Sequence, residues 1–153
     1  MSRTREIVSR SSGETFALGQ TLGGELSGGE VILLTGGLGA GKTLLTKGIL
    51  GGLNFDVDEV TSPSFTLVNL YKTERLDVYH IDLWRSAGEN AAFSVGLEEI
   101  LDDETPVVII EWAEHLGSFH FDRTVYRIEM TGDGDEPRKI SIQPVEQIPA
   151  AHV

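Results

Sequence analysis

The chain has 153 residues, no cysteine and a formal net charge of −12 at pH 7. A chain of this length builds one domain with its own core, and the absence of cysteine excludes disulfides and thiolate metal sites. The negative charge opposes unaided binding of nucleic acid, because proteins that grip a phosphate backbone carry basic patches. No apolar run is long enough for a membrane span and no secretory leader is visible, so we expect a cytoplasmic protein.

The first half of the chain predicts a helix, a buried strand and a second helix. Residues 13–26 carry apolar side chains at helical spacing and follow two serines, which are typical of a helix start. Residues 31–35 (VILLT) form a continuous apolar run, as in strands that are covered on both faces. A second helical pattern starts at Lys42 and ends at a Gly-Gly pair.

The second half predicts two hairpins around a further buried strand. Segments 65–73 (FTLVNLYKT) and 76–84 (LDVYHIDLW) are rich in β-branched and aromatic residues and are separated by a short polar link. Residues 86–103 have a helical pattern. Residues 107–112 (VVIIEW) form the second fully apolar strand, and the last hairpin turns at residues 131–137 (TGDGDEP).

The octapeptide GGLGAGKT, residues 36–43, joins the first buried strand to the second helix and matches the pattern G-x-x-x-x-G-K-[ST]. Backbone N–H groups converge on an anion in this context, so the segment predicts a cradle for the phosphates of a nucleotide. Lys42 would reach the β and γ oxygens, and the Thr43 hydroxyl would ligate Mg²⁺. The predicted nucleotide-binding residues of the loop are Gly36, Leu38, Gly39, Ala40, Gly41, Lys42, Thr43 and Leu44.

These elements together predict a single α/β domain of the P-loop NTPase type over residues 1–153. We expect a central mixed sheet with parallel strands in its core, antiparallel hairpins that extend it, and helices that flank it. The core of the domain is expected at residues 11–143, with a C-terminal tail at 144–153.

Two carboxylates are candidates to complete a magnesium nucleotide site. Glu111 ends the second apolar strand, where an acid beside the loop-bearing strand would ligate the metal. Asp82 ends another strand and would hold a metal-bound water or orient the attacking one. The alternative for each is a strand-end carboxylate that faces solvent. His80 is either a residue that orients Asp82 or an ordinary core histidine.

Two further segments have open interpretations. The hydroxyls of TSPSFT, residues 61–66, lie where many nucleoside triphosphatases carry a segment that senses the γ-phosphate, and Thr66 is the catalytic candidate among them. The proline in this segment could equally serve only to end a loop. Trp112 either packs near the nucleotide or belongs to the core.

The sequence lacks the marks of several related classes. It has neither the N-K-x-D nor the D-x-x-G motif of GTPases, and its arginines are too scattered for the lid of a small-molecule kinase. A small ATPase therefore fits best. A small metabolite kinase and a nucleotide-gated scaffold without turnover remain as alternatives.

Four blocks, in their order and spacing, closely resemble the TsaE family. They are the phosphate loop, SPSFTLVNLY at residues 62–71, YHIDLWR at 79–85 and IEWAE at 110–114. The loop alone would be unspecific, but the four blocks together are highly specific. The resemblance extends over roughly residues 11–143.

The resemblance implies a P-loop ATPase that acts with TsaB and TsaD to form threonylcarbamoyladenosine at position 37 of tRNAs. Carried over, the loop and Lys42 bind phosphates, Thr43 and Glu111 hold Mg²⁺, and Asp82 is the catalytic acid or the water-orienting residue. Trp112 lies near the nucleotide. Contact with tRNA would fall mainly to the partners, which suits the acidic composition, and neither DNA nor a membrane is expected as a partner.

Three positions depart from the family pattern. Gly37 stands where an acidic or amide residue is common, Leu44 where threonine is usual, and Ser64 where threonine is usual. Leu44 lacks a hydroxyl for the α-phosphate but keeps its backbone N–H. We expect these changes to affect nucleotide affinity and not the class of the protein.

Overall fold

The computed structural model describes residues 3–37, 39–60, 67–84, 91–117 and 119–146, and these form one seven-stranded sheet in the order β1-β7-β6-β2-β5-β4-β3. The strands are β1 (Arg5–Ser9), β2 (Val31–Gly36), β3 (Val68–Lys72), β4 (Asp77–Asp82), β5 (Val107–Glu111), β6 (Val125–Thr131) and β7 (Arg138–Pro144). The α-helices are α1 (Ser12–Glu25), α2 (Lys42–Gly52), α3 (Ala91–Ser94) and α4 (Leu97–Leu101), and the 3₁₀ helices are η1 (Val57–Glu59) and η3 (Ala113–Leu116).

The sheet is mixed, as the sequence predicts. β2 lies parallel between β5 and β6, and β4 lies parallel to β5. The pairs β1–β7, β6–β7 and β3–β4 are antiparallel. All five residues of β5 and the first four of β2 are buried, because both apolar runs lie in the middle of the sheet and are covered on both faces.

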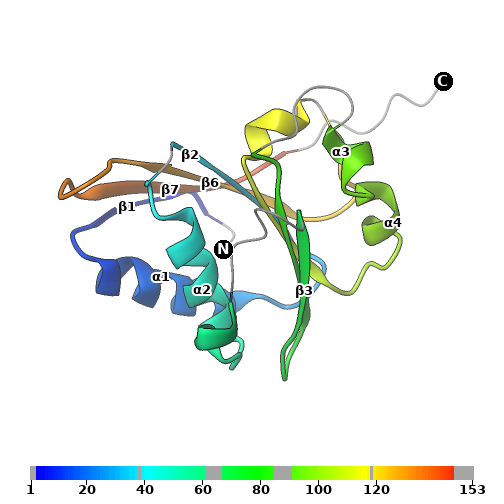
Figure 1. Ribbon diagram of the computed structural model, residues 1–153, viewed down its shortest axis with the longest axis horizontal. Coiled ribbons are helices and arrows are strands. Elements are labelled where there is room, and N and C mark those ends of the chain that lie inside the picture. Colours follow the sequence, from blue (N-terminus) through cyan, green and yellow to red (C-terminus); the bar gives the residue numbers. More distant parts are fainter. Residues whose placement is uncertain (1–2, 38, 61–66, 85–90, 118, 147–153) are drawn as a thin grey trace.

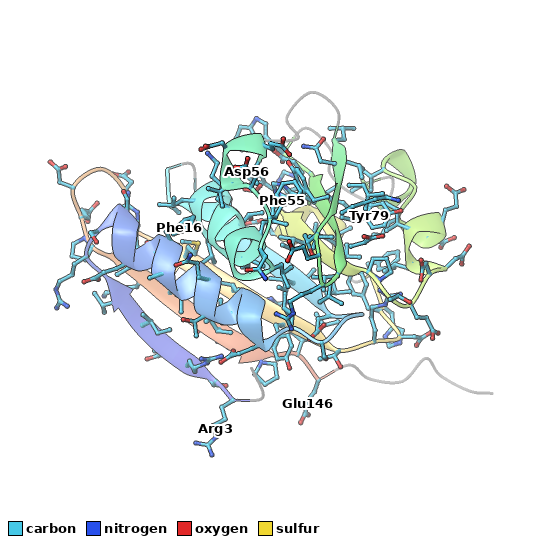
Figure 2. All side chains as sticks on the ribbon, turned by 90° about the horizontal axis from the view of Figure 1, so that it is seen from below. Arg3, Phe16, Phe55, Asp56, Tyr79 and Glu146 are labelled. Atoms are coloured by element: carbon cyan, nitrogen blue, oxygen red, sulfur yellow. The ribbon has the colours of Figure 1, made fainter. Side chains whose placement is uncertain are left out.

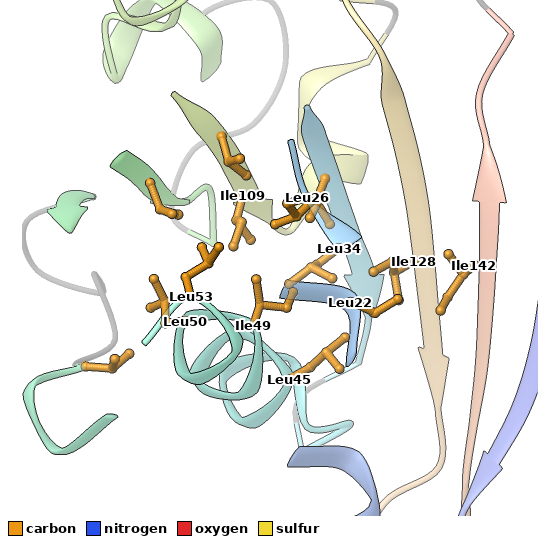
Figure 3. Close-up of a cluster of buried hydrophobic side chains, with 14 of the residues drawn as sticks. Leu22, Leu26, Leu34, Leu45, Ile49, Leu50, Leu53, Ile109, Ile128 and Ile142 are labelled. Carbon is orange, nitrogen blue, oxygen red and sulfur yellow. The ribbon is translucent and has the colours of Figure 1, made fainter. Parts of the chain in front are cut away.

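Helices cover the two faces unequally. Figure 1 shows α1 and α2 side by side on one face, and α3 and α4 on the other face near β3 and β4. On the α1–α2 side, Leu22, Leu45 and Ile49 pack against Leu34 and Ile109 of the central strands in one apolar cluster (Figure 3). This packing fixes α2, and with it the loop that precedes α2, against the C-terminal end of β2.

Glycines allow α1 and α2 to approach at backbone distance. A Cβ atom added at Gly48 would lie 2.4 Å from the carbonyl oxygen of Phe16, and one at Gly23 would lie 2.2 Å from that of Ile49. Neither position has room for a methyl group without movement of the backbone. Figure 2 shows α1 lying across the sheet, with Phe16 on the side that faces α2.

Most predicted elements are confirmed, and three differ. The helical pattern at 86–103 is confirmed in type but not as one helix where the structure describes it, because left-handed backbone at Gly96, with φ of 66°, separates α3 from α4. The strand predicted at 107–112 ends one residue early, since Trp112 adopts φ of 58°. β1 was not predicted. It is a short edge strand in which more buried and more exposed residues alternate. It pairs with β7, which is distant in the sequence, so its local pattern does not predict the strand.

The domain limits stay a prediction. In the part of the chain that the structure describes, no helix combines the length and the apolar character of a membrane span.

Candidate active site

The loop after β2 curls back to begin α2, and glycines allow this path. Gly36 and Gly41 adopt φ of 142° and 101°, and a Cβ at Gly36 would lie 2.4 Å from the carbonyl oxygen of Met130. No side chain of the described residues caps the N-terminus of α2. The first N–H groups of this helix are therefore available to an anion, which the positive end of the helix dipole also favours.

Lys42 lies folded over the loop that it follows. Its Nζ atom donates hydrogen bonds to the carbonyl oxygens of Gly36, at 2.7 Å, and Gly37, at 2.8 Å, and lies 4.1 Å from the centre of the Trp112 ring. Burial lowers the pKa of the Lys42 ammonium, and the nearby carboxylates, Glu111 first among them, oppose this shift. The cation is held by dipoles and an aromatic face, without a direct ion pair among the described residues.

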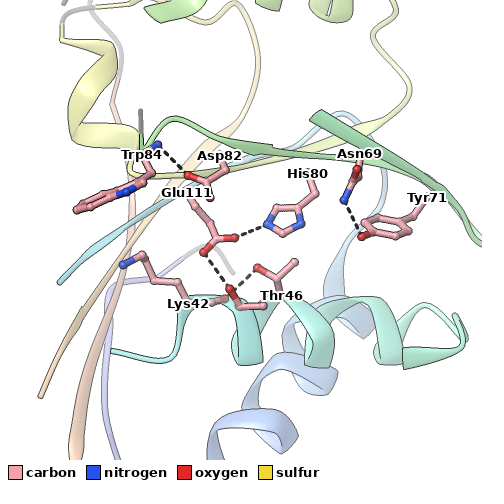
Figure 4. Close-up of polar contacts among 9 residues, drawn as sticks. Lys42, Thr46, Asn69, Tyr71, His80, Asp82, Trp84 and Glu111 are labelled. Atoms are coloured by element: carbon pink, nitrogen blue, oxygen red, sulfur yellow. Dashed lines mark hydrogen bonds and ion pairs between the residues drawn. The ribbon is translucent and has the colours of Figure 1, made fainter. Parts of the chain in front are cut away.

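Glu111 connects α2 to β4 through its two carboxylate oxygens. Oε1 accepts a hydrogen bond from the Thr43 hydroxyl at 3.4 Å, and Oε2 accepts one from Nε2 of His80 (Figure 4). His80 is fully buried, and its Nδ1 atom has no hydrogen-bond partner among the described residues. Among the described residues, the imidazole therefore makes its side-chain hydrogen bond to Glu111 alone, and this bond fixes the direction of the Glu111 carboxylate.

The oxygens of Thr43 and Glu111 fit a magnesium ion. Mg²⁺ prefers oxygen ligands at about 2.1 Å in octahedral geometry, which puts neighbouring ligand atoms about 3 Å apart. The described residues hold no group of three or more His, Asp or Glu side chains arranged for a metal. Two protein ligands are nevertheless enough for Mg²⁺, which usually keeps several waters and binds substrate phosphates.

Asp82 lies beside Glu111 at the end of the sheet, as its register partner on β4. Its side chain is 6% exposed, and Oδ1 accepts a hydrogen bond from the Trp84 backbone N–H at 2.8 Å. Burial raises the pKa of the Asp82 carboxyl, the Trp84 N–H opposes this, and the charge of Glu111 raises it further. Asp82 is thus a stronger base than an ordinary aspartate.

Aromatic rings close one side of this polar cluster. The ring centres of Trp84 and Trp112 are 4.3 Å apart, and that of His115 lies 5.9 Å from Trp112. Nδ1 of His115 is hydrogen-bonded to the carbonyl oxygen of Leu83 at 2.6 Å, which ties η3 to the end of β4. The resulting wall holds Trp112 against Lys42.

The structure brings together Lys42, Thr43, Asp82, Glu111 and Trp112, which are far apart in the sequence. The alternative of strand-end carboxylates that face solvent is wrong for both acids, since Glu111 is 4% exposed and Asp82 nearly as buried. Leu38, Thr66 and the rest of the 61–66 segment lie outside the described residues, so their roles stay predictions.

Of the two interpretations of His80, the one in which it orients Asp82 is wrong in its partner. Residues 80 and 82 share one face of β4, but the hydrogen bond of His80 goes to Glu111 on the neighbouring strand. The longer glutamate side chain reaches the diagonal position across the two strands, whereas Oδ1 of Asp82 bonds to the Trp84 backbone. The histidine thus acts on the carboxylate nearest to Thr43.

A pocket beside the loop joins loop residues that the sequence analysis named to others, such as Arg138, that it did not assign to the site. Its volume is about 260 Å³. It is lined by Ser9, Arg10, Ser11, Ser12, Thr15, Ala40, Gly41, Leu44, Gly134, Asp135, Glu136 and Arg138. Arg138 also donates a hydrogen bond to the carbonyl oxygen of Gly39 at 3.1 Å. Nothing in the sequence pattern signals this contact, because it joins the last hairpin to the loop across 99 positions.

Comparison with known proteins adds independent information. The model of the family described as threonylcarbamoyl adenosine biosynthesis protein TsaE matches residues 9–140. The chain is 41% identical over 111 residues to the tRNA threonylcarbamoyladenosine biosynthesis protein TsaE of Treponema pallidum, with 72% of this chain and 80% of the relative covered. It is 35% identical over 137 residues to the protein of the same name from Mycobacterium leprae, with 82% and 84% covered.

A solved structure is also similar. The crystal structure of YdiB from Bacillus subtilis superimposes with a TM-score of 0.69 and 29% sequence identity, covering 95% of this chain and 88% of that one. The likeness extends over nearly all of the chain. It confirms the α/β fold with a mixed sheet that the sequence predicts.

Proposed function

Because the chain belongs to the TsaE family, we propose that it is a cytoplasmic, magnesium-dependent ATPase that takes part in forming threonylcarbamoyladenosine at position 37 of tRNA. The observation that carries the ATPase activity is the pair of oxygens from Thr43 and Glu111, 3.4 Å apart beside the free N-terminus of α2. A phosphate chain on that helix end would bring its own oxygens to the same point.

Lys42 and the loop backbone would bind the phosphates. On binding, the Lys42 ammonium exchanges the carbonyl oxygens of Gly36 and Gly37 for charged phosphate oxygens, which form stronger hydrogen bonds. The Trp112 ring keeps the ammonium close to this position before the nucleotide arrives.

Thr43 and Glu111 would hold Mg²⁺, and His80 would orient Glu111. When bound, Mg²⁺ neutralises charge that develops on the transferred phosphoryl group. The bond from His80 to Oε2 leaves Oε1 of Glu111 directed at Thr43. His80 is thus a positioning residue that acts through Glu111.

Asp82 would orient the attacking water and accept its proton. A general base works best when its pKa lies close to the working pH, and burial raises the pKa of Asp82 in that direction. The hydrogen bond from the Trp84 N–H occupies Oδ1 and leaves Oδ2 for the water.

The pocket beside the loop would take the nucleoside part of ATP. It adjoins Ala40, Gly41 and Leu44 at the start of α2, so a nucleotide whose phosphates lie on the helix end continues into it. The N-cap residue Ser11 and the hairpin residue Arg138 lie on its walls.

TsaB-like and TsaD-like proteins are the proposed partners, and tRNA would be reached mainly through them. The net charge of −12 suits a subunit that does not itself grip tRNA or DNA. A gel-shift assay that detects tight, salt-sensitive binding of tRNA by the isolated protein would overturn the proposal that tRNA is contacted mainly by the partners.

Phosphate release from Mg-ATP tests the proposal. We expect slow release by the protein alone, stimulation by a TsaB–TsaD pair, and loss in the variant Glu111→Ala. Asp77→Ala, at the far end of β4, is the matched control and retains activity. ATP binding without hydrolysis in all these conditions would favour a scaffold. Phosphate transferred to an acceptor instead of water would favour a kinase.

A further inference from the structure

The last hairpin of the chain lies along the phosphate loop. Its turn, residues 132–137, connects β6 to β7. A Cβ atom added at Gly36 would lie 2.4 Å from the carbonyl oxygen of Met130, near the end of β6. One added at Gly39 would lie 3.8 Å from the Cβ atom of Asp133, in the turn. The hairpin therefore packs against the loop both at its start and farther along it.

Arg138, at the start of β7, connects the turn to the loop through its guanidinium. Nη1 donates a hydrogen bond to the carbonyl oxygen of Glu136, and Nη2 donates to those of Gly39, at 3.1 Å, and Gly134, at 3.2 Å. The stem of the side chain passes Gly132, where an added Cβ atom would lie 3.3 Å from Cδ of Arg138. The planar fork of one side chain thus binds carbonyl groups of two segments at once.

The guanidinium of Arg138 makes these bonds with its charge uncompensated by a direct ion pair. Among the residues that the structure describes, its hydrogen-bond partners are neutral carbonyl groups and no carboxylate lies within ion-pair distance of it. A hydrogen bond from a charged donor is stronger than one between neutral groups. The bond to Gly39 is therefore a firm attachment of the loop to the hairpin.

This bond sets the orientation of one peptide unit of the loop. In a trans peptide the carbonyl group and the N–H of the next residue point in opposite directions, so the Ala40 N–H points away from Arg138. It donates a hydrogen bond to the carbonyl oxygen of Gly37 at 3.3 Å. The same oxygen accepts a hydrogen bond from the Lys42 ammonium. Arg138 therefore holds the Ala40 N–H on the side of the loop where Lys42 lies.

We propose that Arg138 is a positioning residue for nucleotide binding, which acts by holding the peptide unit between Gly39 and Ala40. Arg138 has this role only if the loop binds a nucleotide, as the proposed function states. A bound phosphate would take both the Ala40 N–H and the Lys42 ammonium from the Gly37 carbonyl oxygen. Without Arg138 the peptide unit can rotate, because glycine permits many backbone conformations, and ordering it again would weaken binding.

Two measurements on the full chain test this role: the affinity for Mg-ADP, which needs no turnover, and the amide shift of Ala40 in ¹⁵N NMR without nucleotide. Arg138→Gln should bind ADP about tenfold more weakly and shift the Ala40 amide. Arg138→Lys keeps the charge but cannot reach both segments at once, so it should lose most of this affinity too. Lys139→Gln removes the same charge from the next, exposed residue, and its affinity should stay within about twofold of wild type.

Several results would overturn the positioning role. Weaker ADP binding with an unchanged Ala40 amide would mean that Arg138 acts by touching the nucleotide. A shifted amide with unchanged affinity would mean that the bond is only structural. Full affinity in Arg138→Lys, or an equal loss in Lys139→Gln, would mean that charge alone acts. If the wild-type chain itself binds no ADP, the proposed function fails as well. Thermal unfolding verifies that each variant is folded.

Discussion

The α1–α2 layer and the polar cluster at the ends of β4 and β5 lie against the same central strands. The layer is made of glycine and apolar residues, whereas the cluster is made of buried ionisable residues. In the layer, glycines of the two helices meet at backbone distance, and leucine and isoleucine fill the space below. In the cluster, Lys42, His80, Asp82 and Glu111 are each at most 6% exposed.

The comparison indicates that the layer adds to the stability of the fold and that the cluster reduces it. Buried apolar contact in the layer stabilises the fold, whereas burial of charges costs free energy unless partners compensate them. Two observations mark that cost: the pKa of Asp82 is raised and that of Lys42 is lowered, each mainly by burial. The burial of these charges is therefore best explained by a chemical role of the cluster. The layer is best explained by the need to hold α2 rigid beside the cluster.

The largest expected effect on stability comes from adding a methyl group where α1 and α2 touch. Gly48→Ala puts a methyl group 2.4 Å from the Phe16 carbonyl, so we expect a loss of about 3 kcal/mol in the free energy of unfolding, measured with urea. Gly24→Ala is the control, because nothing lies within 4 Å of its added Cβ. It should stabilise the helix by about 0.5 kcal/mol. Similar losses in both variants would refute the interlocked layer.

The hydrogen bond between His80 and Glu111 should affect the Mg²⁺ concentration that nucleotide binding requires. His80→Asn removes the donor to Oε2, so the Mg²⁺ concentration for half-maximal nucleotide binding should rise about tenfold. His80→Gln extends an amide N–H to nearly the position of Nε2 and should restore most of the affinity. If neither variant shifts the magnesium curve while both unfold normally, His80 is only a core residue.

A smaller effect concerns the backbone of Trp112, which has φ of 58°. Alanine at this position keeps the cost of left-handed backbone, while glycine relieves it. Trp112→Gly should therefore be more stable to urea than Trp112→Ala, by about 1 kcal/mol. Equal stabilities would mean that the backbone relaxes once the ring is removed.

The smallest effect is a pH-dependent gain of stability. Since burial raises the pKa of Asp82 above its unfolded value of 3.8, ionised Asp82 destabilises the folded state at neutral pH. Asp82→Asn should raise the thermal midpoint at pH 7 and keep an acceptor for the Trp84 N–H. This advantage should vanish as the pH falls through the pKa of Asp82. A difference that is constant between pH 7 and pH 4 would contradict burial as the cause.

The sequence predicted the fold well because its strongest signals are local. VILLT, VVIIE and the phosphate loop each carry enough information in a few residues to define a strand or a turn. The sequence also named Asp82 and Glu111, through the rule that acids follow apolar strands. β1 and the break at Gly96 were missed because pairing with β7 and one glycine conformation override weak local patterns.

Contacts that depend on register could not be read from the sequence. The bond from His80 to Glu111 requires β4 and β5 to be aligned with Asp82 opposite Glu111, and the bond from Arg138 to Gly39 joins the last hairpin to the loop.

Turnover and nucleotide binding of Asp82→Asn, measured on one preparation, test the central claim that the polar cluster exchanges stability for chemistry. We predict that phosphate release from Mg-ATP falls about 100-fold or more, the usual contribution of a general base, while ATP affinity changes little. Unchanged phosphate release in a variant that still binds ATP would contradict the account, because the buried charge of Asp82 would then have no chemical role.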